Sequence, residues 1–334
     1  MWSSTGIATD HTQLAFPTHM SMPPAKPSPD TCGYRGVRMH DLFYCMAVLR
    51  SWVFLVHEYN YGDLAFAVCT LTACMIVELI CPACYSLCSL GVPVLLAAHA
   101  VAVHENAMIT AWQVVLLLPM TVLFIGIPMS ICLHRYFSHE AFATSRVVQL
   151  VLAIISTLAY QGGPLWWASL HIRHHKNCDK EHDPHSLVRE GFWYAFLGWM
   201  VCPANYRVDF SPLPAAHRTL EIRCVQKLHV LFPVLLCLIV RHSLGYGVML
   251  WSVLVPMLLC RLITCLFNLE FHPVESERNC KAIDDDRFLA KIVGESCHKD
   301  HHANPRRSRR PDWDLPHRAT LSWMEALGVV WDCR

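Results

Sequence analysis

Seven apolar stretches run along the chain, separated by short polar turns or by two long polar segments. They cover residues 42–57, 64–86, 88–103, 109–133, 147–165, 227–240 and 247–269. A helix that spans a bilayer needs about 20 predominantly apolar residues. The stretches 64–86, 109–133 and 247–269 are long enough, and 88–103 and 227–240 are shorter but usable. This pattern predicts an all-α integral membrane protein.

The two remaining apolar stretches have features that argue against a straight span. The stretch 42–57 contains Arg50 and His57, so we expect it to lie in the membrane interface. The stretch 147–165 ends on the helix-breaking residues 162–164, which are two glycines and a proline. We expect it to form a helix that lies on the membrane or dips into it.

The polar turns predict how the stretches are arranged. Turns at 104–106 and 241–243 join the neighbouring apolar stretches into two helical hairpins. The long polar segments 134–224 and 271–334 therefore lie on the same side of the membrane. Both are rich in Arg and Lys, and positive loops favour the cytoplasmic side. The pattern indicates a cytosolic location for both segments.

Composition agrees with a membrane protein and excludes one class of partner. The chain of 334 residues is 54% hydrophobic and 16% charged, whereas soluble domains are nearer 25% charged. The 27 basic and 26 acidic residues lack the basic excess of a nucleic-acid-binding protein. Residues 1–38 have no signal-peptide pattern, and we expect them to form a disordered tail. Many of the 17 cysteines lie in apolar stretches, and we expect the cysteines to be reduced.

Histidine is unusually frequent and is clustered. Of 21 histidines, eight fall in three short motifs. These are His134-Arg-Tyr-Phe-Ser-His139, His171-Ile-Arg-His174-His175 and His298-Lys-Asp-His301-His302. In a helix, positions i, i+3 and i+4 share one face, so the second and third motifs each align three imidazoles. All three follow apolar stretches on the expected cytosolic side.

This pattern predicts a site with two metal ions. Neutral imidazole suits iron, zinc, copper and nickel, whereas magnesium and calcium prefer oxygen ligands. One zinc ion needs only three or four protein ligands, so eight or nine histidines exceed the needs of one ion. Two ions at the rim of the membrane are well placed to oxidise an acyl chain whose head group stays in water.

These motifs and their order resemble the membrane fatty-acid desaturase family, in its stearoyl-CoA (Δ9) desaturase-like branch. The similarity runs from about residue 88 to residue 334. It includes the three histidine motifs, Asp183-Pro-His185, Gly191-Phe-Trp193, Asn268-Leu-Glu-Phe-His272 and the closing sequence ALGVVWDCR. We therefore divide the chain into a tail (1–38), additional apolar segments (39–87) and a desaturase domain (88–334).

The resemblance implies four core transmembrane helices and a cytosolic helical cap that holds two iron ions. One or two N-terminal apolar segments would be additional to that core. The implied ligands are nine histidines, and Asn268 would reach a metal through water. The histidines are His134, His139, His171, His174, His175, His272, His298, His301 and His302. O2 and an electron donor, cytochrome b5 or a ferredoxin-type protein, complete the reaction.

Neighbouring residues are candidates for supporting roles. Ligand histidines usually donate their second N–H to a carboxylate, and Asp179, Asp183 and Glu295 lie beside the motifs. Trp166 and Trp167 either line the acyl tunnel or anchor the chain at the interface. The basic run 306–310 is a solvated face or contacts anionic lipid or an acidic donor protein.

The expected function is introduction of a cis double bond, at the Δ9 position, into a saturated acyl chain at the membrane of the endoplasmic reticulum. Ser169-Leu170 replaces the Arg-Asp pair that helps the animal enzymes hold coenzyme A. This leaves both acyl-CoA and phospholipid-bound acyl chains as substrates. The alternatives are a lipid or sterol hydroxylase, a histidine-rich metal transporter and a catalytically inactive relative. The spacing of the first motif favours a desaturase, and histidines outside the spans disfavour transport.

Overall fold

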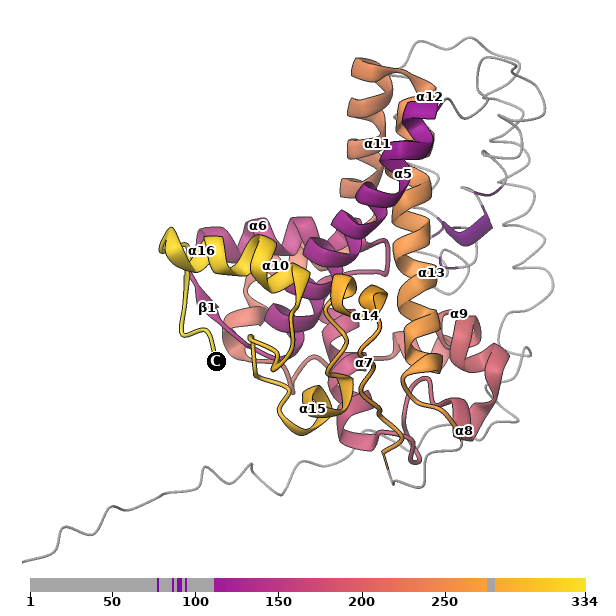
Figure 1. Cartoon of the computed structure of the whole chain (residues 1–334), viewed down its shortest axis with the longest axis vertical. Helices are drawn as coiled ribbons and strands as arrows, with labels where there is room; N and C mark the ends of the chain where they lie inside the picture. Colours follow the sequence, from indigo (N-terminus) through magenta and orange to yellow (C-terminus); the bar gives the residue numbers. More distant parts are fainter. Residues whose placement is uncertain (1–76, 78–85, 87–88, 92–93, 95–110, 275–279) are drawn as a thin grey trace, which may run out of the picture.

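The computed structural model describes residues 77, 86, 89–91, 94, 111–274 and 280–334 (Figure 1). The expected tail, the apolar stretch 42–57, most of 64–86 and of 88–103, and the turn at 104–106 lie outside these residues. The described part is predominantly helical, in agreement with the sequence pattern.

The first long helix passes through the first histidine motif. It consists of α5 (Ala111–Phe124) and the π-helical segment η3 (Ile125–Ser138), and Val115–Ser138 is long and apolar enough to cross a membrane. Pro119 and Pro128 lie inside it, and proline removes one backbone donor. Since the helix continues to residue 138 rather than ending near 133, His134 is held on a helical turn.

The stretch 147–165 forms two helices separated by a sharp bend. They are α6 (Arg146–Ser156), followed by the 3₁₀ turn η4 (Thr157–Ala159), and α7 (Pro164–Asn177). The bend is 76°. Gly162 adopts φ +91°, which favours glycine, and Pro164 occupies the first turn of α7, where its missing N–H costs nothing. In Figure 1, α6 runs across the direction of α5 and α13.

The second half contains another bent pair and the second long helix. The elements are α10 (Leu220–Lys227), α11 (Leu231–Leu244), α12 (Tyr246–Met249), the π-helical η8 (Leu250–Leu254) and α13 (Val255–Glu270). Tyr246–Glu270 is long and apolar enough to span, and α10 and α11 bend by 65°. Residues 241–243 belong to α11, so the expected turn is displaced to Gly245 at φ +90°.

Short elements complete the described part. They are β1 (Ala143–Thr144), α8 (Leu187–Glu190), η5 (Tyr194–Gly198), α9 (Trp199–Val201), η6 (Pro203–Tyr206), η7 (Ala215–Arg218), α14 (Phe288–Val293), α15 (His298–Ala303), η9 (His317–Leu321), α16 (Ser322–Ala326) and β2 (Val330–Trp331). Strands β1 and β2 pair antiparallel, with Ala143 opposite Trp331. This pairing fixes the C-terminal end beside the end of η3.

Two apolar clusters join these elements. One packs α5 and η3 against α13 and η8, and the other packs η3 against α6, α7 and α10. In Figure 1, α5, α11 and α13 rise from one end of the molecule, whereas α7, α14 and α15 gather at the other end. The described residues contain two candidate spans, or four if each bent pair crosses as one unit. This is a helical membrane protein.

The expectation of reduced cysteines is wrong for part of the chain. Cys178 and Cys280 form a disulfide, and Cys202 is also disulfide-bonded. The cysteines inside the described apolar helices, including Cys132 and Cys260, are free thiols, as expected. Cys178 and Cys280 are 102 positions apart. Their pairing depends on long-range folding, and local sequence carries no signal for it.

Candidate metal centre

Four elements bring the nine expected histidines together at the end of the molecule where α7 and α15 lie. His134 lies on η3 and His139 directly follows it. The second motif lies on α7 and the third on α15, as the i, i+3, i+4 spacing predicted. His272 lies just after the end of α13.

Five histidines form the first of two neighbouring groups. These are His134, His139, His171, His175 and His301, and each offers a ring nitrogen within 4.8 Å of the others. Nε2 of His134 lies 2.7 Å from Nε2 of His301, and Nε2 of His171 lies 3.0 Å from that of His139 and 3.1 Å from that of His175. The Nε2 atoms therefore face a common centre.

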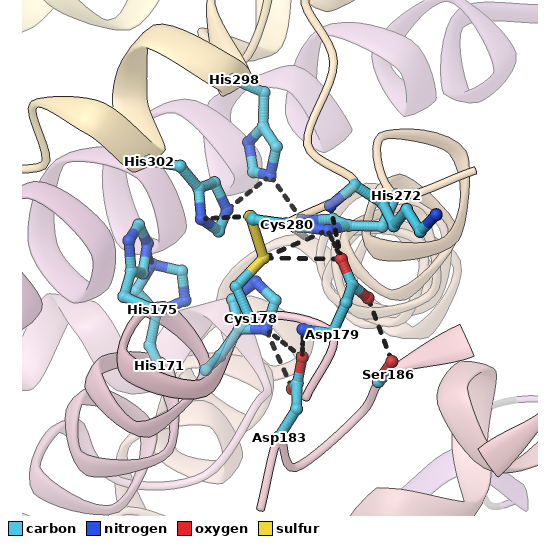
Figure 2. The surroundings of a disulfide bond; sticks show 12 residues. His171, His175, Cys178, Asp179, Asp183, Ser186, His272, Cys280, His298 and His302 are labelled. Carbon is cyan, nitrogen blue, oxygen red and sulfur yellow. Dashed lines mark hydrogen bonds and ion pairs between the residues drawn. A yellow bond between two sulfur atoms is a disulfide. The ribbon is translucent and has the colours of Figure 1, made fainter. Parts of the chain in front are cut away.

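The second group is built from the remaining four histidines. Ligand atoms of His174, His272, His302 and Cys178 lie within 4.8 Å of one another. Nε2 of His298 lies 3.1 Å from Nε2 of His272 and 3.2 Å from Nε2 of His302. Figure 2 shows the rings of His272, His298 and His302 turned toward one another. His174 and His175 are adjacent on α7, and each serves a different group.

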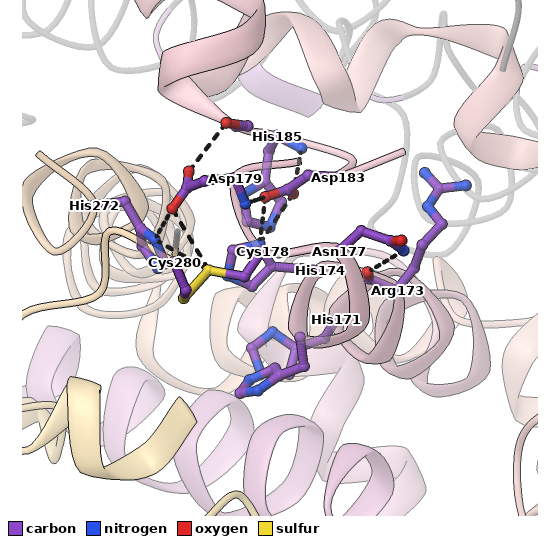
Figure 3. A network of polar contacts seen from close by, with 12 residues as sticks. His171, Arg173, His174, Asn177, Cys178, Asp179, Asp183, His185, His272 and Cys280 are labelled. Atoms are coloured by element: carbon purple, nitrogen blue, oxygen red, sulfur yellow. Dashed lines mark hydrogen bonds and ion pairs between the residues drawn. A yellow bond between two sulfur atoms is a disulfide. The ribbon is translucent and has the colours of Figure 1, made fainter. Parts of the chain in front are cut away.

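Three buried carboxylates contact the outer nitrogens of four of these rings. Nδ1–H of His174 donates to both oxygens of Asp183 at 3.0 Å, and Nδ1–H of His272 donates to Asp179 at 3.0 Å (Figure 3). Nδ1–H of His298 donates to Glu295 at 3.1 Å, and the other Glu295 oxygen lies 3.0 Å from Nδ1 of His134. A proton held on Nδ1 leaves the Nε2 lone pair free for a metal.

Outside the two candidate spans, the pKa values of Glu295, Asp183 and His272 are all lowered. Burial tends to raise the pKa of Glu295, but His134 and His298 outweigh it and hold that pKa well below its usual range. The pKa of Asp183 is lowered in the same way by His174. Burial lowers the pKa of His272 to about 4, even though Asp179 opposes the shift. Neutral imidazole is the form that binds metals.

The arrangement fits a pair of cations. Where Nδ1 carries the proton, two Nε2 lone pairs face each other at about 3 Å, as in His272 and His298. Such lone pairs repel unless a cation lies between them. Imidazole donors without a carboxylate at the centre suit iron or another late transition metal rather than magnesium.

His301 differs from the other ligand candidates in its outer contact. The Arg310 guanidinium donates to Nδ1 of His301 at 3.0 Å, and both side chains are buried. Without a metal, the proton of His301 therefore lies on Nε2, directed at His134. A neutral His301 that bound a cation through Nε2 would carry its proton on Nδ1, so its contact with Arg310 would have to change. Sequence reasoning did not identify Arg310, because its role depends on this contact.

A cavity leads to the two groups. Its wall includes His134, His171 and His298 together with Asn268, which lies on α13 one turn before His272. Apolar side chains form much of the rest of the wall, among them Met129, Leu170, Phe267 and Phe271. The cavity therefore places apolar side chains directly beside the imidazoles.

A polar network braces this cavity. The Gln161 side chain accepts from Trp167 Nε1–H at 3.0 Å and donates to Thr264 Oγ1 at 2.9 Å, and all three line the cavity. Of the two tryptophans, Trp167 thus lines the cavity. Trp166 instead stacks on Trp199 at 5.9 Å between ring centres.

One histidine that sequence reasoning did not assign also lies here. His185 stacks on His174 at 4.4 Å between ring centres and lines the cavity. The motif Asp183-Pro-His185 was the available signal, but it does not specify which element the ring contacts.

Three arginines of the basic run 306–310 are paired with acids of the same chain. Arg306 pairs with Glu140, Arg307 with Asp300 and Arg309 with Glu325. These pairs favour the interpretation of these three arginines as a structural, solvated face, whereas Arg310 is buried against His301.

Comparison with known proteins identifies the family. A model described as fatty acid desaturase matches residues 110–324. A hex-5-enoyl-(acyl-carrier protein) acetylenase of Moorena producens (strain JHB) is 30% identical over 236 residues, covering 62% of this chain and 73% of that protein. Delta-9 acyl-lipid desaturase 2 of Arabidopsis thaliana is 30% identical over 227 residues, covering 63% and 71%.

A third relative is similar over a shorter range. The sn-1 stearoyl-lipid 9-desaturase of Anabaena variabilis is 28% identical over 185 residues, covering 53% of this chain and 66% of that protein. The family match spans more than half of the chain and includes all nine clustered histidines. This chain therefore belongs to the fatty acid desaturase family, in its Δ9 desaturase-like branch, and is a desaturase enzyme.

Proposed function

We propose that the protein introduces a cis Δ9 double bond into a saturated acyl chain esterified to a membrane lipid, using O2 and two electrons. The observation that carries this proposal is the convergence of nine histidines, in two adjacent groups, at an apolar cavity. Two iron ions would bind the five-histidine and four-histidine groups, and Asn268 would reach the second ion through water. Bound iron would supply the activation of O2 that organic side chains lack.

The protein's own contribution is to hold the rings and to position the substrate. Asp179, Asp183 and Glu295 keep the ring protons on Nδ1 and thereby direct the Nε2 atoms inward. The Gln161–Trp167–Thr264 network fixes the cavity wall beside His134 and His171. Holding one methylene pair at a fixed distance from the ions is catalysis by positioning.

Two observations favour a lipid-esterified substrate over acyl-CoA. Leu170 is 2% exposed and lines the cavity, where an acidic residue of the animal enzymes would stand. Two of the similar proteins are named as acyl-lipid and stearoyl-lipid desaturases. We infer a phospholipid or other glycerolipid as the carrier.

Electron supply and location complete the proposal. The donor is cytochrome b5 or a ferredoxin-type protein that approaches the histidine-bearing end of the molecule. We place the enzyme as a multi-pass protein in the endoplasmic reticulum, with the histidine motifs facing the cytosol, because positive segments flank the spans.

The test is fatty-acid profiling in a host that lacks its own Δ9 desaturase. Wild-type protein is compared with His301→Ala and His272→Ala, which remove one ligand from each group. His242→Ala, an exposed histidine on α11, is the matched control. We expect a Δ9 monounsaturated acid with the wild type and the control, and at least a 100-fold loss with either ligand variant. Gas chromatography–mass spectrometry with double-bond localisation measures the amount of this product and the position of its double bond.

The other outcomes identify the alternatives. Hydroxylated lipid in place of an alkene would indicate a hydroxylase, and metal uptake without lipid change would indicate a transporter. No product from iron-loaded wild type supplied with either electron donor would indicate an inactive relative. Purified enzyme given isotope-labelled acyl-CoA or labelled phosphatidylcholine distinguishes the two carriers.

A further inference from the structure

The Cys178–Cys280 disulfide joins two segments that carry ligand histidines. Cys178 directly follows α7, three residues after His175, and Cys280 lies eight residues after His272. The Cα atoms are 5.2 Å apart, within the usual range for a disulfide. This bond closes the four-histidine group on one side (Figure 2).

Both sulfurs lie against the outer nitrogens of histidines in that group. Cys280 Sγ is 3.5 Å from Nδ1 of His302, and Cys178 Sγ is 3.7 Å from Nδ1 of His272. The inner Nε2 atoms of both rings face His298. The disulfide therefore occupies the position behind the rings that carboxylates occupy elsewhere in the centre.

The two rings depend on the disulfide to different degrees. His272 is also held by Asp179, which in turn accepts from the Lys281 backbone N–H at 2.8 Å and from Ser186 at 3.0 Å. His302 differs from His272: among the described residues, its Nδ1 atom contacts the Cys280 sulfur and no carboxylate. Loss of the covalent bond would free His302 more than His272.

On the basis of the proposed iron site, we propose that Cys178 and Cys280 are positioning residues whose disulfide holds the four-histidine group for its iron ion. In the reaction with a small thiol, two thiol molecules are oxidised to their disulfide, and the protein disulfide is reduced to two protein thiols. The two sulfur atoms then move from bonding distance to van der Waals contact. The segment that contains Cys280 is no longer covalently tied to the end of α7. Iron retention in this group thus depends on the thiol–disulfide balance of the compartment.

The test measures iron retention and the spectrum of the bound iron. Detergent-purified, ⁵⁷Fe-loaded full-length protein is challenged with a ferrous chelator, as wild type, as wild type reduced with a dithiol, and as Cys178→Ser/Cys280→Ser. Cys224→Ser, which removes an exposed free thiol on α10, is the matched control. We expect release of one of the two ions to be at least tenfold faster after reduction and in the double variant, on the scale of ligand-supporting contacts.

The spectroscopic readout separates positioning from general stability. Mössbauer spectra should change for one iron and leave the other as in wild type, because both sulfurs contact the four-histidine group. The dithiol also reduces the Cys202 disulfide, and the double serine variant isolates the pair in question. The reduced wild type keeps the test valid if that variant fails to fold.

Three results would overturn the inference. Equal chelation rates in all samples would exclude the positioning role, and so would equal change at both irons. Mass spectrometry after thiol alkylation that finds both cysteines free in active, two-iron wild type would exclude the disulfide. In each case desaturation by the wild type would leave the proposed function intact. A wild type that binds no iron would overturn both proposals.

Discussion

At the scale of single residues, the important contacts are those behind the ligand rings. Asp183 accepts from His174 and also from the backbone N–H groups of Asp179 and His185, at 2.8 and 3.2 Å. One carboxylate thus fixes both a ring and the loop that carries its neighbours (Figure 3). The nine histidines indicate the chemistry, whereas the three acids determine which nitrogen is free in the four rings that they contact.

Replacing Asp183 by Asn tests this role with almost no change of shape. The amide accepts more weakly than a carboxylate, and its NH₂ group cannot accept the His174 proton. We expect iron affinity of the four-histidine group to fall about 10–100-fold, measured as iron per chain after dialysis against a graded chelator series.

Asp209→Asn is the control for that variant. Asp209 bonds Ser211 in an exposed turn, so its replacement should leave iron binding as in wild type. Equal iron loss in the two variants would show that Asp183 does not position His174.

At the scale of elements, α7 is placed by a contact from another helix. Its first turn begins at Pro164, and the Gln226 side chain of α10 accepts from the backbone N–H groups of Leu165 and Trp166 at 2.9 and 3.0 Å. Gly163 lies so close that a Cβ there would meet Gln226 at 2.4 Å. The cap therefore orients the helix that carries three of the proposed ligands.

Gln226→Leu removes this cap, so the two backbone N–H groups at the start of α7 lose their side-chain acceptor. We expect the free energy of unfolding to fall by about 1–2 kcal/mol, as for other lost helix caps. Thermal unfolding of the metal-free protein in detergent measures the change. Gln226→Glu retains the acceptor and suits the positive end of the helix, so it should stay near wild type. Equal destabilisation by both variants would argue against capping.

At the scale of the whole molecule, the centre makes stability depend on pH. Burial lowers the pKa of His139, His301 and His302 well below the ordinary value of 6.5 in the folded, metal-free chain. The unfolded chain binds protons near that value, but the folded chain does not. Stability is therefore fully present above pH 6.5 and is lost as the pH falls below it.

The expected slope is large enough to measure. Each of these three histidines contributes about 1.4 kcal/mol per pH unit below 6.5, within the range where the folded ring stays neutral. Unfolding midpoints of metal-free protein should fall steadily from pH 7 to pH 5. Iron-loaded protein should resist acid unfolding down to a lower pH, because the ions compete with protons for the ring nitrogens. A flat profile for the metal-free chain would contradict the assigned burial of these rings.

Local pattern was sufficient for some elements and insufficient for others. The apolar stretches 109–133 and 247–269 predicted two spans, and the structure forms candidate spans at Val115–Ser138 and Tyr246–Glu270, because a span is defined by its own residues. Pro164 and the two glycines before it indicated a break in the helix. They did not indicate the 76° bend that turns α7 toward the histidines of the other elements. That angle depends on packing against η3 and α10.

The motifs along the chain were sufficient to assign the family and its class of enzyme. Histidine spacing is a local, helical property, so aligned imidazoles and a metal-dependent reaction could be inferred from the motifs. Three other features follow only from the packed fold. His174 and His175 face different groups, Glu295 contacts two rings, and Cys178 bonds Cys280. These pairings join segments far apart in the chain. They arise when the helices pack, and local periodicity cannot specify them.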